Sequence, residues 1–419
     1  MSDQTFGDFQ ELNVGPRRGQ VQLGQTFYAL MLGVLIFLAS DPMYPLLMRG
    51  PSEWVATVPG LDGVRRLVWL GIYGIMMLGF IVMHRRIVPA LTNQLYFFLT
   101  MAFFIISSLW AHSTSEGIIG GVQALFTMVF GIVIGYRLGS EGIVKGIFVS
   151  GILTVAASLM FVVVFPEHAF GYHHNKGALR GIYPEKNLLA QYLSYACWAS
   201  VFMCLIYPRS WMLKAYALLV VILCFACISS IALLQLVVIF GSVFYLFVTR
   251  RVAHRGAIAL LLTLSAIMAV VMVLPIVLAA LGEDLTFNGR TVLWSHLIAN
   301  ILEQPWIGYG YRGFWHTSAA EQMRSILGWS AYGAHNVWVQ AALFGGIVGL
   351  GLWIAQWWAV LLKACRDFGS NEAVHKSAMS VFVFMALLWS MFETTQLQHF
   401  THNAILTGLA FAMRSPGFR

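Results

Sequence analysis

The chain has 419 residues, of which 59% are hydrophobic and only 10% are charged, and its mean hydropathy is +0.76. A soluble domain usually carries about 25% charged residues, so this composition excludes an ordinary soluble protein and indicates an integral membrane protein. The formal net charge of +8 does not indicate a nucleic-acid partner, because many of the basic residues lie in short segments beside apolar runs, where positive charge marks the cytoplasmic side of a membrane.

Apolar runs of membrane-spanning length recur along the whole chain and predict an all-α polytopic protein, a single integral membrane domain over residues 1–419. A short tail over residues 1–20 precedes the first span. Alternating ten-residue segments typical of a barrel are absent, so the spans are predicted to be helices. About twelve spans are expected, at 21–40, 67–83, 95–110, 117–136, 146–165, a sixth after 187, two between 215 and 248 divided near 229, 256–280, 337–362, 378–392 and 401–412.

Lysine and arginine are distributed unequally between the two sides of this arrangement. Twelve spans place both termini on one side, and the loops of that side and the two termini carry 16 of the 25 basic residues. The positive-inside trend therefore predicts cytoplasmic termini. Two polar loops, 166–187 and 282–335, then face away from the cytoplasm, and six of the nine remaining basic residues lie in them.

Arginines in these two outward loops run against the positive-inside trend and call for an explanation. Arg180 lies in the string GALRGIYPEKN before the sixth span, and Arg290 lies in NGRTVLW after the ninth. The fixed donors of a guanidinium suit an anion with several oxygens, such as a pyrophosphate. The alternative is a side chain that extends to lipid headgroups. We favour anion binding for Arg180 and Arg290, and lipid contact for Arg312 and Arg324.

His335 closes the long loop in the string GAHN, where the next span begins. A neutral imidazole can accept a proton from a sugar hydroxyl, which is the role of a general base in glycosyl transfer. The alternative is a histidine that caps the start of a helix at the membrane interface. Because His335 ends a loop that carries arginines, we interpret it as the candidate base.

Further polar residues at the outer ends of predicted spans are possible supporting groups: Lys186, Asn187, Asn336 and Glu393. Helix capping explains Asn187 and Glu393 equally well. His173 and His174, with Glu167 and Glu185 nearby, permit a metal site, but the sequence gives no ligand geometry and we expect none. Within the long loop, 291–302 has helical spacing and is expected to lie along the membrane surface, with one face formed by Trp294, Leu297, Ile298 and Ile301.

These strings follow one another in an order that resembles the O-antigen ligase and Wzy-type polymerase superfamily. The order is R-G-x-x-x-x-K-N before a span, then G-R-x-x-x-W, then P-x-x-G-x-G, then H-N opening the next span. The string SSLW at 107–110 also fits. The form RGIYPEKN is most similar to the exopolysaccharide-polymerisation (ExoQ-like) branch.

The resemblance implies a metal-independent, inverting membrane glycosyltransferase of the GT-C type in the bacterial inner membrane, without a cofactor. Such enzymes take a glycan from undecaprenyl pyrophosphate at the periplasmic face. Ligases deliver it to lipid A–core, and polymerases deliver it to another lipid-linked glycan. Carried over to this chain, the resemblance assigns the pyrophosphate to Arg180 and Arg290 and the base to His335. The absence of paired carboxylates at hydrolase-like spacing disfavours a glycosidase.

Two other classes of function stay open at this stage. A transporter or flippase commonly has twelve spans, but it usually binds its substrate near the membrane midplane between two related halves. Here the polar residues gather at one face, and the long loop has no counterpart in the first half. A non-catalytic scaffold for an export complex is the third class. The sequence does not decide between ligase and polymerase, and it does not identify the sugar or its linkage.

Overall fold

A computed structural model of the chain describes residues 16–42, 61–171, 177–248, 290–328, 331–369, 374–398 and 400–418, with scattered residues between 257 and 272. These residues form helices and no strand, apart from one isolated bridge between Phe170 and Leu179. Most of the predicted span at 256–280 lies outside the described residues. The elements are α1 (Pro16–Leu38), α3 (Leu61–Val82), α4 (His84–Leu91), α5 (Leu95–Ser107), η2 (Ser108–Trp110), α6 (Thr114–Val164), α7 (Pro166–Ala169), α8 (Lys186–Ile206), α9 (Trp211–Ala226), α10 (Ser230–Val248), α12 (Arg290–Glu303), η4 (Gly313–His316), α13 (Ser318–Leu327), α14 (Val337–Gly369), α15 (Val374–Ser390), η5 (Thr395–Leu397) and α16 (His402–Ala412).

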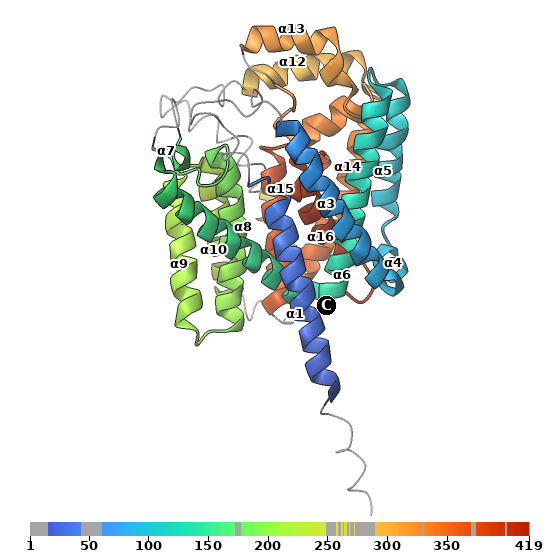
Figure 1. Cartoon of the computed structure of the whole chain (residues 1–419). Coiled ribbons are helices and arrows are strands. Elements are labelled where there is room, and N and C mark those ends of the chain that lie inside the picture. Colours follow the sequence, from blue (N-terminus) through green and yellow to red (C-terminus); the bar gives the residue numbers. More distant parts are fainter. Residues whose placement is uncertain are drawn as a thin grey trace, which may run out of the picture.

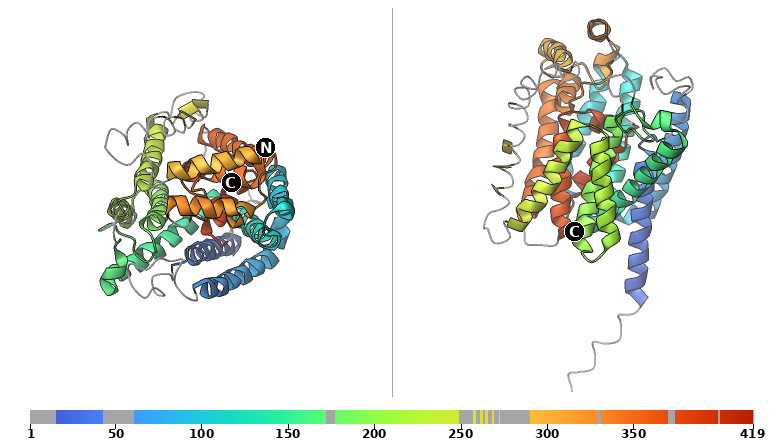
Figure 2. Two further views of the ribbon diagram at one scale, coloured as in Figure 1. Left: turned by 90° about the horizontal axis from the view of Figure 1, so that it is seen from above. Right: turned by 90° about the vertical axis from the view of Figure 1, so that its left-hand side faces the viewer.

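The long helices stand upright in one bundle, and α12 and α13 lie across one end of it (Figure 1). Seen from that end, α12 and α13 run side by side over the centre of the bundle (Figure 2). The start of α1 and the C-terminus therefore lie at the end of the bundle opposite to α12 and α13.

Fewer helices pass a length test for membrane crossing than the sequence predicts. Among the described residues, five are long and apolar enough, or six if the bent pair α4 and α5 is one span. The apolar helices α9 and α15 have 16 and 17 residues, and α16 has 11. About 20 residues of helix are needed to cross about 30 Å of hydrocarbon, so these three are shorter than a full crossing. Five or six helices of crossing length still indicate a multi-pass membrane protein whose described part is helical.

The predicted spans 117–136 and 146–165 are the two helical arms of α6, which has 51 residues and a kink between the arms. The arms meet at Gly139, whose φ of 65° and ψ of −177° are not helical. A glycine adopts this left-handed φ without steric cost, so the chain turns there without a loop. Figure 1 shows the two arms running at an angle to each other. The sequence predicts a connection between Arg137 and Lys145. In the structure the only non-helical residue of this connection is Gly139.

α8, α15 and α16 lie inside the bundle: most residues of α8 and α15 and every residue of α16 are buried. The indole Nε1 of Trp198 on α8 donates to the carbonyl of Ala378 on α15 at 2.9 Å, which fixes the two helices against each other. A helix buried on all sides is what an apolar composition without a polar stripe produces. The polar residues at the start of α8 therefore lie at a fixed place under the long loop.

The surface helix α12 packs on the bundle through a face slightly different from the one expected. Leu293 and Leu297 are fully buried, whereas Ile298, which the sequence assigned to the same face, is 50% exposed. The indole Nε1 of Trp294 donates to the carbonyl of Ala334 at 2.7 Å. This contact joins the start of α12 to the end of the long loop.

Candidate active site

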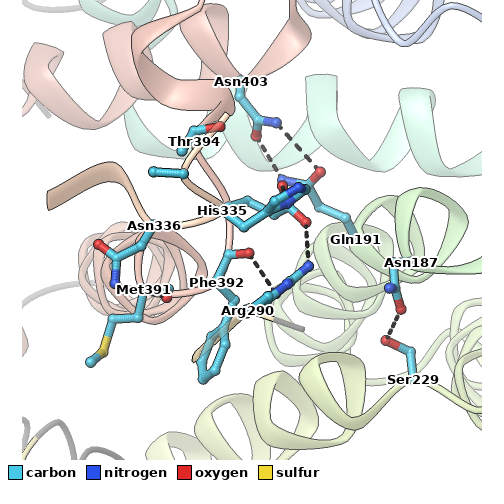
Figure 3. Close-up of polar contacts among 12 residues, drawn as sticks. Asn187, Gln191, Ser229, Arg290, His335, Asn336, Met391, Phe392, Thr394 and Asn403 are labelled. Atoms are coloured by element: carbon cyan, nitrogen blue, oxygen red, sulfur yellow. Dashed lines mark hydrogen bonds and ion pairs between the residues drawn. The ribbon is translucent and has the colours of Figure 1, made fainter. Parts of the chain in front are cut away.

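Glu393, in the segment that follows α15, joins the two candidate residues of the long loop. Nη2 of Arg290 lies 3.3 Å from its Oε1, and Nδ1 of His335 lies 3.3 Å from its Oε2. Nη1 of Arg290 also donates to the carbonyl of Phe392 at 2.9 Å (Figure 3). The side chains of Arg290 and Glu393 are 16% and 18% exposed and that of His335 is 30% exposed, so the cluster is partly shielded but open to a substrate.

The backbone on both sides of His335 is fixed by side chains. Nδ2 of Asn336 donates to the carbonyl of Met391 at 3.2 Å, and Trp294 holds the carbonyl of Ala334. Oδ1 of Asn336 accepts from the first free amides of α14, at Trp338 and Val339. His335 itself has a φ of 48°, a left-handed conformation that is uncommon for residues other than glycine and is retained only where the surroundings impose it.

The carboxylate of Glu393 is ionised in this setting. Burial alone would raise its pKa, but the hydrogen bond and charge of His335 and the charge of Arg290 outweigh burial and hold the pKa below its usual value of 4.5. An ionised carboxylate only accepts hydrogen bonds, so in the neutral imidazole the proton sits on Nδ1. Nε2 of His335 then keeps its lone pair, as a general base requires.

Glu185 is a further charged group of this site that the sequence argument missed as a site residue. It is the N-cap residue of α8, and although its side chain reaches the protein surface, the surrounding protein removes much of the solvent around its carboxyl group. Loss of solvation in the surrounding protein and then the charge of Glu393 raise its pKa, while His335 and Arg290 act in the opposite direction. The start of α8 is thus within electrostatic reach of the Glu393 cluster. Its position between Pro184 and Lys186 in the RGIYPEKN string was the available signal.

Arg180 makes its identified contacts to the backbone of its own loop. Nε donates to the carbonyl of His168 at 2.8 Å, and Nη1 donates to the carbonyl of Pro184 at 3.2 Å. The residue is 6% exposed. Through Pro184, Arg180 fixes the turn that leads directly to Glu185.

Lys186 and Asn187 are directed to the turn between α9 and α10. Nζ of Lys186 donates to the carbonyl of Ile228 at 3.1 Å, and Oδ1 of Asn187 accepts from Oγ of Ser229 at 3.0 Å. Figure 3 shows the Asn187–Ser229 pair beside the cluster, without a contact to His335. These two side chains fasten neighbouring helices at the site's edge.

Buried polar residues at the starts of α8 and α16 lie under the site and were not anticipated. Gln191 and Asn403 exchange hydrogen bonds at 2.7 and 3.4 Å (Figure 3). Their sequence neighbours are also paired: the hydroxyl of Tyr192, which follows Gln191, is bonded to Nδ1 of His402, which precedes Asn403. Amides and an imidazole inside apolar runs were the signal, because such groups are costly in a membrane unless they are paired.

The remaining candidate residues of the two loops are not among the identified contacts of Glu393. Nη1 of Arg324 donates to the carbonyl of Trp315 at 3.2 Å, and its guanidinium lies 5.0 Å from the ring of Tyr332. His173 and His174 lie outside the described residues. Within the part of the chain that is described, no group of three or more histidine, cysteine or acidic side chains is arranged to hold a metal ion.

The fold and this cluster define a class: a multi-pass helical membrane protein with an arginine–carboxylate–histidine site at one end of its bundle. Residues 190–354 match the family model described as O-antigen ligase (Wzy_C). The exopolysaccharide production protein ExoQ of Rhizobium meliloti (strain 1021) is 24% identical over 302 residues, which cover 67% of each chain. The chain is therefore similar to the O-antigen ligase/Wzy-type family, and its long apolar helices indicate a multi-pass membrane protein.

Proposed function

We propose that this protein transfers a glycan from undecaprenyl pyrophosphate to an acceptor hydroxyl at the periplasmic face of the bacterial inner membrane. The acceptor is lipid A–core for a ligase and a second lipid-linked glycan for a polymerase. The printed name of the Rhizobium relative, an exopolysaccharide production protein, supports the polymerase form. The proposed architecture has about twelve spans of the GT-C type, cytoplasmic termini, and periplasmic loops at 166–187 and 282–335.

The observation that carries this proposal is the division of the two Glu393 oxygens between His335 and Arg290. One oxygen fixes the tautomer of a candidate base, and the other holds a cation that suits phosphate oxygens. Both side chains come from the ends of one long loop, and the cluster is partly exposed. A structural ion pair between Arg290 and Glu393 would not require an imidazole on the second carboxylate oxygen.

In the proposed reaction, Nε2 of His335 removes the proton of the acceptor hydroxyl as its oxygen attacks the anomeric carbon of the donor. The bond from that carbon to the pyrophosphate oxygen breaks, and its electron pair stays on the pyrophosphate. Glu393 stabilises the imidazolium that forms on His335. A single displacement inverts the anomeric configuration. No cofactor or metal ion is part of this proposal.

Arg290 is proposed to bind the pyrophosphate, whose growing negative charge must be stabilised as the bond breaks. The bond of its Nη1 to the Phe392 carbonyl orients the guanidinium, and the donor's phosphate oxygens compete with Glu393 for Nη2. Arg180 is proposed to add positive charge from the neighbouring loop, where its bonds to two carbonyls fix it. Lys186, Asn187 and Asn336 support the site by holding the surrounding backbone.

The test is product formation in cells that lack the native gene and express His335→Ala or Glu393→Gln. We expect His335→Ala to reduce polymer or glycolipid by about 10²- to 10⁴-fold, the usual contribution of a general base. Equal protein levels in the membrane are the control. Undiminished product from a correctly inserted His335→Ala protein would refute the assignment. Substrate movement into proteoliposomes without bond formation would favour a transporter.

A further inference from the structure

The segment Pro305–Tyr311, here called the strap, follows α12 and lies in a break of α14. The break is at Gly346, which has a φ of 59° and a ψ of −155° inside an otherwise helical run. Three backbone hydrogen bonds join the strap to the two sides of the break: Ile347 N–H to the Pro305 carbonyl at 2.8 Å, Val348 N–H to the Trp306 carbonyl at 3.3 Å, and Tyr309 N–H to the Leu343 carbonyl at 3.0 Å. The groups freed by the break are therefore satisfied by the strap.

The glycines of the P-x-x-G-x-G string make this close approach possible. A Cβ added to Gly346 would lie 2.3 Å from the backbone of Trp306, and one added to Gly308 would lie 2.7 Å from the backbone of α14. Both residues also have positive φ. Substitution at either position would push the strap out of the break. This explains a string that the proposed reaction leaves without a role.

The other side of the strap is fixed to the end of α5, in the SSLW string. Oγ of Ser107 accepts from the amide of Tyr311 at 2.9 Å, and Nε1 of Trp110 donates to the carbonyl of Gly308 at 3.3 Å. The strap is therefore held between two helices. Its last residue, Tyr311, has a defined position and direction.

Tyr311 reaches from the strap to the segment that carries Glu393. Its ring is fully buried and packs edge-on against Phe344 at 5.0 Å, with Phe104 at 6.1 Å. Its hydroxyl donates to the carbonyl of Leu397 at 2.6 Å. Leu397 lies four residues after Glu393, at the end of η5.

Three side-chain donors hold carbonyls of the segment 391–397, here called the Glu393 turn. Asn336 bonds Met391, Arg290 bonds Phe392 and Tyr311 bonds Leu397. The first two donors come from the site itself. Tyr311 donates to the carbonyl at the turn's far end, where Gln396 of the turn also donates from Nε2 to the Ala386 carbonyl of α15 at 2.9 Å. The position of the Glu393 carboxylate thus depends on a hydroxyl that does not touch the reacting groups.

We propose that Tyr311 is a positioning residue for glycan transfer: it holds the Glu393 turn so that Glu393 meets His335. This inference rests on the proposed function, in which Glu393 orients the base. Loss of the hydroxyl leaves the Leu397 carbonyl without its donor, and the turn relaxes. A displacement of about 1 Å at a catalytic group is enough to reduce a rate by about 100-fold.

The experiment compares Tyr311→Phe with Tyr309→Phe, measuring the rate of product formation in membranes supplied with polyprenyl-pyrophosphate-linked glycan. Tyr309 is a matched control on the same strap, because its hydroxyl bonds Asn300 and Glu303 of α12 and not the Glu393 turn. We expect Tyr311→Phe to lower the rate by about 10- to 100-fold and Tyr309→Phe to leave it within about twofold.

A double-mutant cycle with Glu393→Gln separates positioning from general stability. If Tyr311 acts through Glu393, adding Tyr311→Phe to Glu393→Gln lowers the rate by less than about threefold. If Tyr311 only stabilises the fold, its full effect persists in the Glu393→Gln background, which overturns the inference. Should Tyr311→Phe fail to insert, Ser107→Ala, which releases the Tyr311 amide, is tested in the same cycle.

The two levels of failure are distinguishable. An inactive His335→Ala protein together with a fully active Tyr311→Phe protein would overturn only the role of Tyr311. An active His335→Ala protein would overturn the proposed function first.

Discussion

The two polar loops lie at the same end of the bundle but use their charged residues differently. In the long loop, Arg290 and His335 meet side chain to side chain on Glu393. In the short loop, Arg180 bonds backbone carbonyls, and Lys186 holds the turn between α9 and α10. An outward-facing cation in a membrane protein is therefore not by itself a sign of catalysis. The group that the cation contacts indicates its role. A partly exposed carboxylate shared by an arginine and a histidine can take part in proton transfer and anion binding, whereas hydrogen bonds to backbone carbonyls only hold a loop in place.

The largest loss of product formation is expected for substitution of Arg290 in the long loop. Replacing it with alanine should lower product formation by about 100-fold or more, and replacing it with lysine should lower it by about 10-fold. Lysine has no planar fork to contact Phe392 and a phosphate together. Polymer or glycolipid in cells, normalised to membrane protein level, measures both effects. Full activity of Arg290→Lys would favour the scaffold interpretation.

A smaller effect on activity is expected for Arg180→Lys, within about fivefold of the unchanged protein, because the proposed role needs only a positive charge. Arg180→Ala should instead destabilise the fold, since it removes the side-chain donor of the partly buried carbonyls of His168 and Pro184, at about 1 kcal/mol each. Thermal unfolding of purified protein measures this loss. A stable Arg180→Ala protein with a strongly weakened affinity for the glycan donor would contradict this prediction, because both loops would then bind the donor directly.

Much of the fold could be predicted from the sequence, because lipid forces each crossing to be an apolar helix. The division of the 215–248 tract is an example: α9 ends at Ala226 and α10 begins at Ser230. The break of α6 at Gly139 falls between the predicted spans 117–136 and 146–165 and is a second example, but the absence of a loop there was not anticipated. The direction of the second arm of α6 after Gly139 depends on its packing against the neighbouring helices.

The candidate site was predictable in part. Arg290 and His335 were selected because each stands at one end of a polar loop. Glu393 was named only as a possible supporting group. Its pairing with both side chains could not be predicted, since it lies 103 residues from Arg290 and 58 from His335, and no local pattern links them. The directions of Lys186 and Asn187 depend on the rotation of α8 about its axis, which tertiary packing sets.

The two carboxylates nearest the site should show opposite pH behaviour. The pKa of Glu393 is lowered, so its ion pairs stabilise the fold above the usual carboxyl pKa of 4.5 and are lost as pH falls through the lowered value. Glu393→Gln should therefore destabilise the protein by on the order of 1 kcal/mol at pH 7. The difference in unfolding temperature from the unchanged protein should shrink below about pH 4. A difference that is constant with pH would contradict the ion-pair account.

The smallest effect is expected for Glu185, whose pKa is raised. An acid of raised pKa destabilises the fold as pH rises from its unfolded pKa through its folded pKa, and the penalty is fully present above the folded value. Glu185→Gln should therefore raise the unfolding temperature slightly, by less than about 2 °C, at pH 7 but not at pH 3. A lowered unfolding temperature at pH 7 would show that the ionised carboxylate is stabilising, as in the Glu393 cluster.

The most direct test of the long-loop site is the release of polyprenyl pyrophosphate by purified protein in proteoliposomes, supplied with a polyprenyl-pyrophosphate-linked glycan and an acceptor. The unchanged protein and Arg180→Lys should release it together with an elongated or transferred glycan. His335→Gln should release less than about one hundredth as much, because a glutamine amide cannot take the acceptor proton. Release by His335→Gln at the rate of the unchanged protein would contradict the account.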